Sequence, residues 1–227
     1  MSRHVVLGAG PVARAIVESL KKRNIDVDVV TRSGTEIAGA RAITANVLDT
    51  ENLAKVVAGA AAVYQASQPE YHRWPQEFPA LQDSVVRAVR STDAVLVAVE
   101  NLYGYGPVAG PISEQHPLSA TTRKGKTRAE LWRSLEAEHR AGRLKATAGR
   151  ASDFFGPHVS ASAVGARFFP PILNGKKAES GKLRWESDQL SSGDITFSVI
   201  RRGARVGVRV WDAHSEAREH FTGLKWY

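Results

Sequence analysis

The sequence contains no cysteine among its 227 residues. Disulfide bonds, thiolate metal sites and a cysteine nucleophile are therefore all excluded. No apolar run approaches the ~18 residues that a membrane-spanning helix requires, so we expect no membrane partner. The first residues, MSRHVVLGAG, pass directly into a strand-like segment without the charged and apolar regions of a signal peptide. We therefore expect a cytoplasmic protein.

The composition is otherwise ordinary for a packed globular protein, with 43% hydrophobic and 24% charged residues. Lysine and arginine outnumber the acidic residues by 31 to 23, which gives a net charge of +8. A basic chain of this kind calls for an anionic partner. The phosphates of a nucleotide cofactor would meet that need locally, and nucleic acid would meet it over a wide surface. Charge alone does not separate the two.

The amino-terminal stretch HVVLGAGPVARAIVESLKKRNIDVDVV carries the clearest pattern. His4 to Leu7 is typical of a short buried strand, and Gly8, Gly10 and Ala13 follow it as G-x-G-x-x-A. Apolar residues then recur at helical spacing, and a second strand is predicted over residues 27–30. A strand, a glycine turn, a helix and a strand within ~30 residues indicate a dinucleotide-binding turn. The alternative is a glycine turn in some other α/β protein.

Each position of this turn has a physical reason. Gly8 permits the tight turn, Gly10 lets a diphosphate approach the backbone, and Ala13 is small enough for close packing of helix on strand. The free N–H groups and the dipole at the helix start then attract the phosphates. The predicted contacts to the diphosphate come from Gly8, Gly10, Pro11, Val12 and Ala13.

The end of the second strand indicates which dinucleotide binds. NAD-binding proteins place a carboxylate about 20 residues past the glycines, whereas this chain has Thr31, Arg32 and Ser33. A guanidinium can hold a 2′-phosphate with two parallel hydrogen bonds. We therefore favour NADP over NAD, with NAD less favoured. The alternative is that Arg32 is only a solvated turn residue.

Strand and helix patterns alternate through the next part of the chain. Further strands are predicted at residues 42–47, 61–66, 94–99 and 144–149, and helices at 51–58, 76–90 and 127–140. This order predicts an α/β fold, a Rossmann-like doubly wound parallel sheet with helices on both faces. Ligands of such sheets bind at the carboxyl ends of the strands, which places Ala66, at the end of the fourth strand, beside the cofactor.

Three segments at the strand ends carry a family resemblance. These are ANVLD (45–49), NLYGYGP (101–107) and RASDFFGP (150–157). Together with the glycine turn they resemble the extended and atypical short-chain dehydrogenase/reductase superfamily, in particular its NAD(P)-dependent epimerase/dehydratase group. The resemblance implies that Asp49 lies beside the adenine, that the substrate is a small organic molecule, and that the protein forms a homodimer.

The same resemblance identifies candidate catalytic residues. The family uses a tyrosine for proton exchange, a lysine four residues later, and a serine or threonine after the fifth strand. Lys126 matches the lysine, but Thr122 stands at the tyrosine position and Asn101 at the serine position. A threonine hydroxyl is a far poorer acid than a phenol, so Tyr103 is a candidate for the missing phenol. Glu100 is a further candidate acid, with a structural role as the alternative.

The basic run around Lys126 is interpreted through this resemblance. Lys126 is expected on the nicotinamide ribose, and Arg123, Lys124 and Arg128 are interpreted as solvated or close to phosphate. A nucleic-acid patch would require interleaved aromatic residues or a reading helix, and this run has neither. Nucleic acid is therefore not favoured as a partner.

The resemblance predicts two domains: an NAD(P)-binding Rossmann domain over residues 1–157 and a reduced or divergent substrate-binding region over 158–227. Residues 160–179 are similar to the first helix of that region, and 194–212 alternate like a hairpin. The histidines and glutamates of 214–220 fit no zinc spacing, so no metal is predicted. The tail is either a native short cap or a truncated or frame-shifted end.

Two functions follow from these observations. The first is an NADP-dependent oxidoreductase or epimerase/dehydratase-like protein with a degenerate tyrosine and serine site. The second is a catalytically inactive NADP-binding sensor or regulatory protein, which the loss of both proton-handling residues favours.

Overall fold

The computed structural model describes residues 2–110, 112–152, 154 and 158–159, and the backbone of three strands between 189 and 212. The chain forms two compact units, Met1–Ser152 and Asp153–Tyr227. No helix in the described ranges is long and apolar enough to span a membrane.

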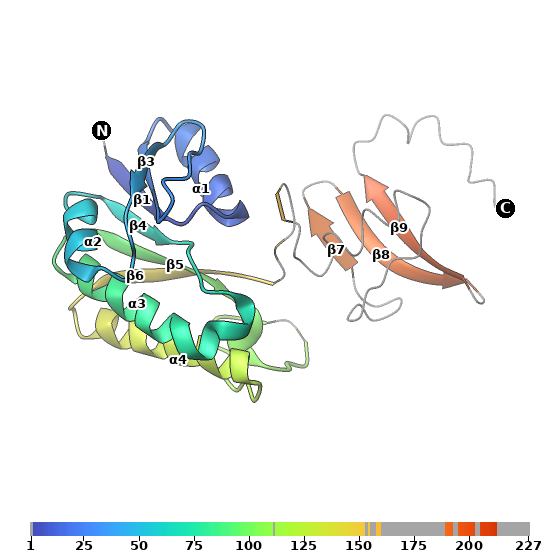
Figure 1. Ribbon diagram of the computed structural model, residues 1–227. Helices are drawn as coiled ribbons and strands as arrows, with labels where there is room; N and C mark the ends of the chain where they lie inside the picture. The colour runs from blue at the N-terminus through green and yellow to red at the C-terminus, as the bar shows by residue number, and fades with distance from the viewer. Residues whose placement is uncertain are drawn as a thin grey trace. The chain divides into compact units, whose positions relative to one another are not determined.

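The first unit is built on one six-stranded sheet with the order β3-β2-β1-β4-β5-β6, in which every neighbouring pair is parallel (Figure 1). The predicted doubly wound parallel sheet is therefore confirmed. The strand order reverses between β1 and β4, and ligands of such sheets bind at the carboxyl ends of the strands at that point. The elements are β1 (Arg3–Leu7), α1 (Pro11–Lys21), β2 (Asp26–Thr31), β3 (Arg41–Thr44), α2 (Thr50–Val57), β4 (Ala62–Gln65), η1 (Tyr71–Arg73), α3 (Trp74–Arg90), β5 (Val95–Asn101), η2 (Leu102–Tyr105), α4 (Arg123–Arg140) and β6 (Lys145–Ala151).

Helices cover the two faces of the sheet unequally. On one face, Val17 and Leu20 of α1 pack in a buried cluster with Val6 and Val29. On the other face, α2, α3 and α4 build the larger cluster, and α3 and α4 lie alongside each other beneath the sheet (Figure 1). Because successive side chains of a strand point to opposite faces, the continuous apolar run of β1 serves both clusters.

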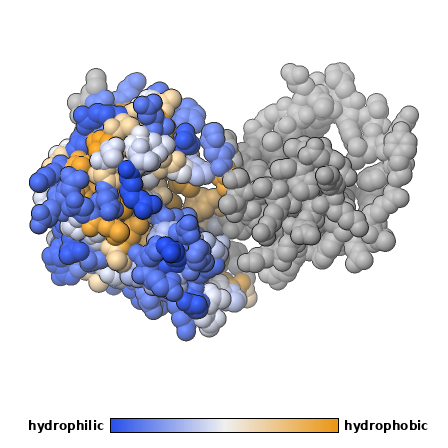
Figure 2. Space-filling view, in the orientation of Figure 1, coloured by the Kyte–Doolittle hydropathy of each residue, from blue (hydrophilic) through white to orange (hydrophobic). Residues whose placement is uncertain are grey.

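The buried core of this unit is largely apolar, and the face seen in Figure 2 is mainly hydrophilic with a few apolar areas. The large hydrophobic side chains that stay exposed among the described residues are Leu48, Tyr71 and Ile112. Single exposed apolar residues are common on protein surfaces. Tyr71 differs from the other two because it lies near the carboxyl edge of the sheet, between β4 and α3.

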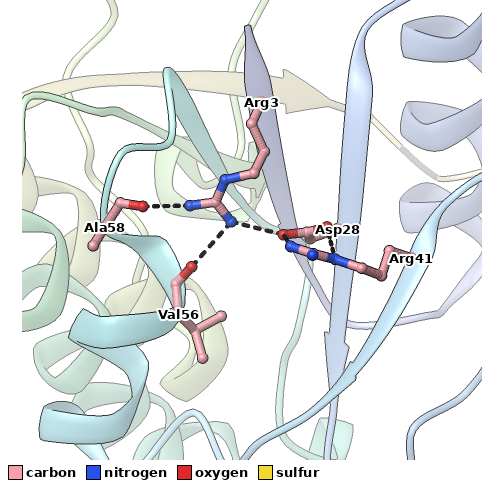
Figure 3. A network of polar contacts seen from close by, with 5 residues as sticks. All are labelled: Arg3, Asp28, Arg41, Val56 and Ala58. Carbon is pink, nitrogen blue, oxygen red and sulfur yellow. Dashed lines mark hydrogen bonds and ion pairs between the residues drawn. The ribbon is translucent and has the colours of Figure 1, made fainter.

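A buried carboxylate ties four elements together away from the glycine turn (Figure 3). Asp28 is 3% exposed, and Arg41 donates to both of its oxygens at 2.8 and 2.7 Å. Arg3 Nη1 donates to Asp28 at 2.7 Å and to the Val56 carbonyl at 3.2 Å, and Arg3 Nη2 donates to the Ala58 carbonyl. Burial alone would raise the pKa of Asp28, but the hydrogen bonds from Arg41 and Arg3 outweigh it, so the pKa lies below its ordinary value.

The clearest differences from the predicted element boundaries are in β3, α3 and α4. β3 ends at Thr44 instead of Val47, α3 begins at Trp74, and α4 begins at Arg123 rather than four residues later. Both helices begin with polar or aromatic residues that break the apolar periodicity on which the predictions depended. For α4 the start is instead determined by a cap, because the Thr122 side chain accepts a hydrogen bond from the Gly125 N–H at 3.2 Å.

The second unit contains an antiparallel sheet of three strands among its described residues, β7 (Gln189–Ser192), β8 (Ile195–Arg202) and β9 (Arg205–Asp212). β8 and β9 pair from Ile195 opposite Asp212 to Arg202 opposite Arg205, which confirms the predicted hairpin. β7 was not predicted. The predicted helix over 160–179 and the segment 214–220 lie outside the described residues.

Candidate functional site

Gly8 lies where the ends of β1 and β4 meet. Its φ of 108° is a conformation that other residues rarely adopt. A Cβ at this position would lie 3.0 Å from the backbone nitrogen of Ser67, which follows β4. The fold itself therefore requires glycine here.

Gly10 has a different reason to be glycine. Its backbone, with φ −69° and ψ −179°, is one that most residues adopt. A Cβ at Gly10 would meet nothing within 4 Å. No clash within the protein therefore requires glycine at this position, whereas a ligand lying over the start of α1 would need the space that a side chain would fill.

The start of α1 is left without a side-chain cap. Gly10 is the N-cap, Pro11 occupies the first turn, and that turn holds no acidic residue. The Arg14 N–H donates to the Gly10 carbonyl at 3.0 Å, so the amides of Val12 and Ala13 precede the first intrahelical bond. Unsatisfied amides at the positive end of a helix dipole form an anion site.

A buried hydroxyl beside this turn was missed by sequence reasoning. Ser67 Oγ is buried and has no hydrogen-bond partner in the described part of the chain. Ser67 follows Ala66, whose N–H donates to the Leu7 carbonyl at 3.1 Å, so both residues lie beside Gly8. The only signal in the sequence was their position after a buried strand. The unpaired hydroxyl of Ser67, the open space at Gly10 and the unpaired amides at the start of α1 are together the features expected of a dinucleotide-binding site.

The loop after β2 contains the predicted cofactor-selecting residues. Thr31 Oγ1 accepts a hydrogen bond from the Thr35 N–H at 2.8 Å, and the Ser33 and Thr35 hydroxyls lie 2.8 Å apart. Arg32 is exposed between them, and within the described ranges it forms no ion pair. Asp28, the buried carboxylate of β2, lies in mid-strand and is bound by two arginines.

Asp49 serves as a helix cap. Its side chain accepts a hydrogen bond from the Asn52 N–H at 3.1 Å at the start of α2. One carboxylate oxygen is therefore used within the protein. The predicted place of Asp49 beside an adenine stays a prediction.

The three candidate catalytic residues around α4 have unequal environments. Lys126 is exposed in the first turn of α4. Thr122 is exposed and its hydroxyl caps that helix through Gly125. Asn101 is buried, and its Oδ1 accepts a hydrogen bond from the Tyr103 N–H at 3.1 Å. The side chains at the two substituted positions thus form local structural hydrogen bonds.

Arg128 corrects one interpretation of the basic run. It was interpreted as solvated or close to phosphate, but it is 4% exposed. Its guanidinium lies 4.2 Å from the ring centroid of Trp74 and 4.5 Å from that of Phe78. Nη2 donates to the Gln68 Oε1 at 2.9 Å, and Nη1 lies 3.6 Å from the Glu100 carboxylate.

This burial has a simple cause. Arg128 occupies the same helical stripe as Leu131 and Leu135, which are both buried. A search for apolar periodicity passes over an arginine at such a position. Burial raises the pKa of Glu100, and the nearby charges of Arg128 and Arg150 act in the opposite direction. Because Glu100 is 3% exposed, it acts as the partner of Arg128 and not as a surface acid.

Comparison with known proteins gives the family. The NAD dependent epimerase/dehydratase family matches residues 4–192. The chain belongs to this family. No curated protein matches it.

Solved structures of this family share the fold. UDP-N-acetylglucosamine 4-epimerase from Bacillus cereus is 17% identical with a TM-score of 0.66, over 78% of this chain and 62% of that one. UDP-glucose 4-epimerase from Brucella ovis in complex with NAD is 18% identical with a TM-score of 0.59, over 66% and 51%. The enzyme WbmG from Bordetella bronchiseptica in complex with NAD is 15% identical with a TM-score of 0.62, over 87% and 64%. This chain therefore matches only about half to two thirds of each structure's length.

Two tyrosines of this epimerase/dehydratase family member follow β5. Tyr105 is fully buried, and its hydroxyl accepts a hydrogen bond from Arg150 Nη1 at 3.0 Å. Tyr103 is partly buried, with its ring centroid 6.3 Å from that of Tyr71 and 6.2 Å from that of Trp74. Tyr105 is thus held in the interior, and Tyr103 is the more accessible phenol. A proton-transfer role for Tyr103 stays a prediction.

Proposed function

We propose that residues 1–157 bind a nicotinamide dinucleotide over the glycine turn, NADP in preference to NAD, and that the protein is an oxidoreductase or epimerase/dehydratase-like enzyme for a small organic substrate. The observation that carries this proposal is the open space at Gly10, where a side chain would lie over the uncapped start of α1. The bound dinucleotide would supply or accept a hydride at its nicotinamide ring.

Different residues of the chain contact different parts of the dinucleotide. The amides of Val12 and Ala13 hold the diphosphate, and Lys126 reaches the nicotinamide ribose. The Brucella and Bordetella structures hold NAD, so the preference for NADP depends on Arg32 alone. Arg32 is exposed at the end of β2, where NAD-specific proteins place a carboxylate.

A second candidate function has its own support. The Thr122 hydroxyl accepts a helix-capping hydrogen bond, and the Asn101 amide accepts one from the following loop. Neither replaces the acidic phenol that the family uses. These observations favour an NADP-binding sensor or regulatory protein that does not turn over.

The cofactor proposal is tested by calorimetric titration of the protein with NADPH and NADH. A guanidinium bound to a 2′-phosphate contributes about 1.5–3 kcal/mol. We therefore expect Arg32→Ala to weaken NADPH binding roughly ten- to hundredfold and to leave NADH nearly unchanged. Arg87→Ala, on the last turn of α3, is the matched control. Equal losses of affinity for NADPH and NADH would show that Arg32 does not bind the 2′-phosphate.

Turnover is tested separately by mixing the NADPH-loaded protein with a panel of carbonyl compounds. Loss of absorbance at the nicotinamide band would support the enzyme. Tight NADPH binding without that loss would exclude net reduction of these carbonyl compounds and leave the sensor or an epimerase/dehydratase, whose hydride returns to the substrate within each turnover. Binding of neither coenzyme would contradict both. The homodimer implied by the resemblance stays a proposal, which sedimentation of the same sample would check.

A further inference from the structure

Three aromatic rings meet at the carboxyl edge of the sheet, next to the start of α4. Tyr71 lies in η1 after β4, Trp74 begins α3, and Tyr103 lies in η2 after β5. The Tyr71 ring is edge-on to Trp74 at 4.8 Å and to Tyr103 at 6.3 Å. Edge-to-face contact is a favoured geometry for aromatic pairs. The three rings therefore form one wall from two separate loops and a helix start.

This wall has a rigid base. Trp74 is 2% exposed, and its Nε1 donates to the Pro69 carbonyl at 3.2 Å. The Arg128 guanidinium covers its ring at 4.2 Å. Tyr71 is itself 47% exposed, so a buried and hydrogen-bonded tryptophan supports a ring that faces solvent. A ring held in this way loses little conformational freedom when a ligand binds.

A lysine lies on the exposed ring. Lys124 Nζ is 3.3 Å from the centroid of Tyr71, which is a cation–π contact. Lys124 belongs to the first turn of α4, two residues before Lys126. The contact holds an ammonium group at the aromatic wall.

The charge at this helix start is unbalanced. Arg123, Lys124 and Lys126 all lie in the first turn of α4, which holds no acidic residue. Cations at the positive end of a helix dipole are unfavourable. None of the three forms an ion pair with a carboxylate in the described part of the chain, and Glu100 pairs with Arg128 instead. An anion from outside the protein would relieve this repulsion.

From these observations we propose that Lys124 and Tyr71 form a substrate subsite for an organic anion with a flat apolar body, such as an aryl carboxylate. The ammonium of Lys124 binds the anionic group, and the rings of Tyr71 and Tyr103, which the buried Trp74 supports, contact the flat body. This inference deepens the proposed function and depends on it, because the subsite lies at the same helix start as Lys126, which is proposed to hold the nicotinamide ribose.

The test is a calorimetric titration of the NADPH-saturated protein with benzoate and with its neutral isostere benzamide. We expect benzoate to bind about tenfold more tightly, the ratio that one charge-assisted hydrogen bond supplies. Lys124→Met should abolish this preference and Lys124→Arg should keep most of it. Tyr71→Leu should weaken the binding of both benzoate and benzamide. Lys55→Met, an exposed lysine in α2, is the matched control.

The outcomes separate this inference from the proposed function. Equal binding of the two probes, binding of neither, or an unchanged preference in Lys124→Met would overturn the subsite. If NADPH itself does not bind, the proposed function fails. The same titration with benzoate and benzamide, carried out on the nucleotide-free protein, then tests the subsite alone. Melting curves of each variant show that a lost preference is not lost folding.

Discussion

At the scale of single residues, the two glycines of the turn have different structural environments. Gly8 is required by backbone conformation and by the approach of Ser67, which lies on another strand end. Gly10 has an ordinary conformation and open space around it. The fold therefore requires glycine at position 8, whereas no clash within the protein requires it at position 10.

This difference gives a paired prediction. Gly8→Ala should lower the free energy of unfolding by about 1–3 kcal/mol, because its φ is strained for alanine and its Cβ meets a backbone. Gly10→Ala should leave that free energy within about 1 kcal/mol of wild type. It should nevertheless weaken NADPH binding roughly tenfold or more, because an inserted methyl group costs about 1–3 kcal/mol against a bound ligand.

Urea unfolding and calorimetry on the same two variants measure these effects. A Gly10→Ala protein that binds NADPH as tightly as wild type would show that no ligand lies over this residue. A Gly8→Ala protein with wild-type stability would show that the turn relaxes around the added carbon.

At the scale of elements, local hydrogen bonds decide where helices begin. Asp49 caps α2 and Thr122 caps α4, and in each case the side chain accepts from a backbone N–H three residues on. These bonds satisfy amides that the helix itself leaves unpaired. The caps therefore give both residues a purpose that is independent of any cofactor.

The capping role of Thr122 is tested by a pair of substitutions. Thr122→Ala should lower the free energy of unfolding by about 1 kcal/mol, and Thr122→Ser should keep most of the stability, because serine also caps helices. Thermal unfolding of both variants measures the difference. Equal stability of Thr122→Ala and wild type would mean that the hydroxyl contributes no cap.

Asp28 connects β1, β2, β3 and the end of α2 through two arginines. Removing its charge leaves Arg3 and Arg41 without their shared partner. Since both arginines are partly exposed, we expect Asp28→Asn to lower the free energy of unfolding by about 2–3 kcal/mol, less than for a fully buried pair.

The same carboxylate predicts a pH dependence. The pKa of Asp28 is depressed in the folded state, so its stabilising contribution is complete above the unfolded value of about 3.9 and is lost as the pH falls through the folded value. Wild type should lose stability steeply below about pH 4. Asp28→Asn should show a shallower slope there in urea unfolding. Parallel pH profiles would contradict this assignment.

At the scale of the whole molecule, the proposed cofactor residues gather in one of the two units. The glycine turn, Arg32, Ser67 and Lys126 all lie within Met1–Ser152, as do all six strands of the parallel sheet. We therefore expect a fragment ending at Ser152 to melt cooperatively. Its NADPH affinity should stay within about threefold of the full chain, because local units of this kind carry their own contacts.

Differential scanning calorimetry and NADPH titration of the fragment test this expectation. A fragment that folds but does not bind NADPH would place an essential cofactor contact after Ser152. Loss of benzoate binding in a fragment that retains NADPH would instead show that the substrate subsite needs the second unit.

The sequence by itself determined the fold class, the glycine turn, the order of helices and strands in the first unit, and the hairpin of the second. Periodicity and turn chemistry are local properties, so they can be read along the chain. The family resemblance also came from short local segments, such as NLYGYGP and RASDFFGP.

Only the tertiary structure decided the burial of Arg128 against two aromatic rings, the orphaned hydroxyl of Ser67 beside Gly8, and the carboxylate network at Asp28. Each depends on strands and helices that are distant in sequence and adjacent in the sheet. The sequence alone does not distinguish a buried arginine from a solvated one. The two differ only in the neighbouring residues that the fold places around the side chain.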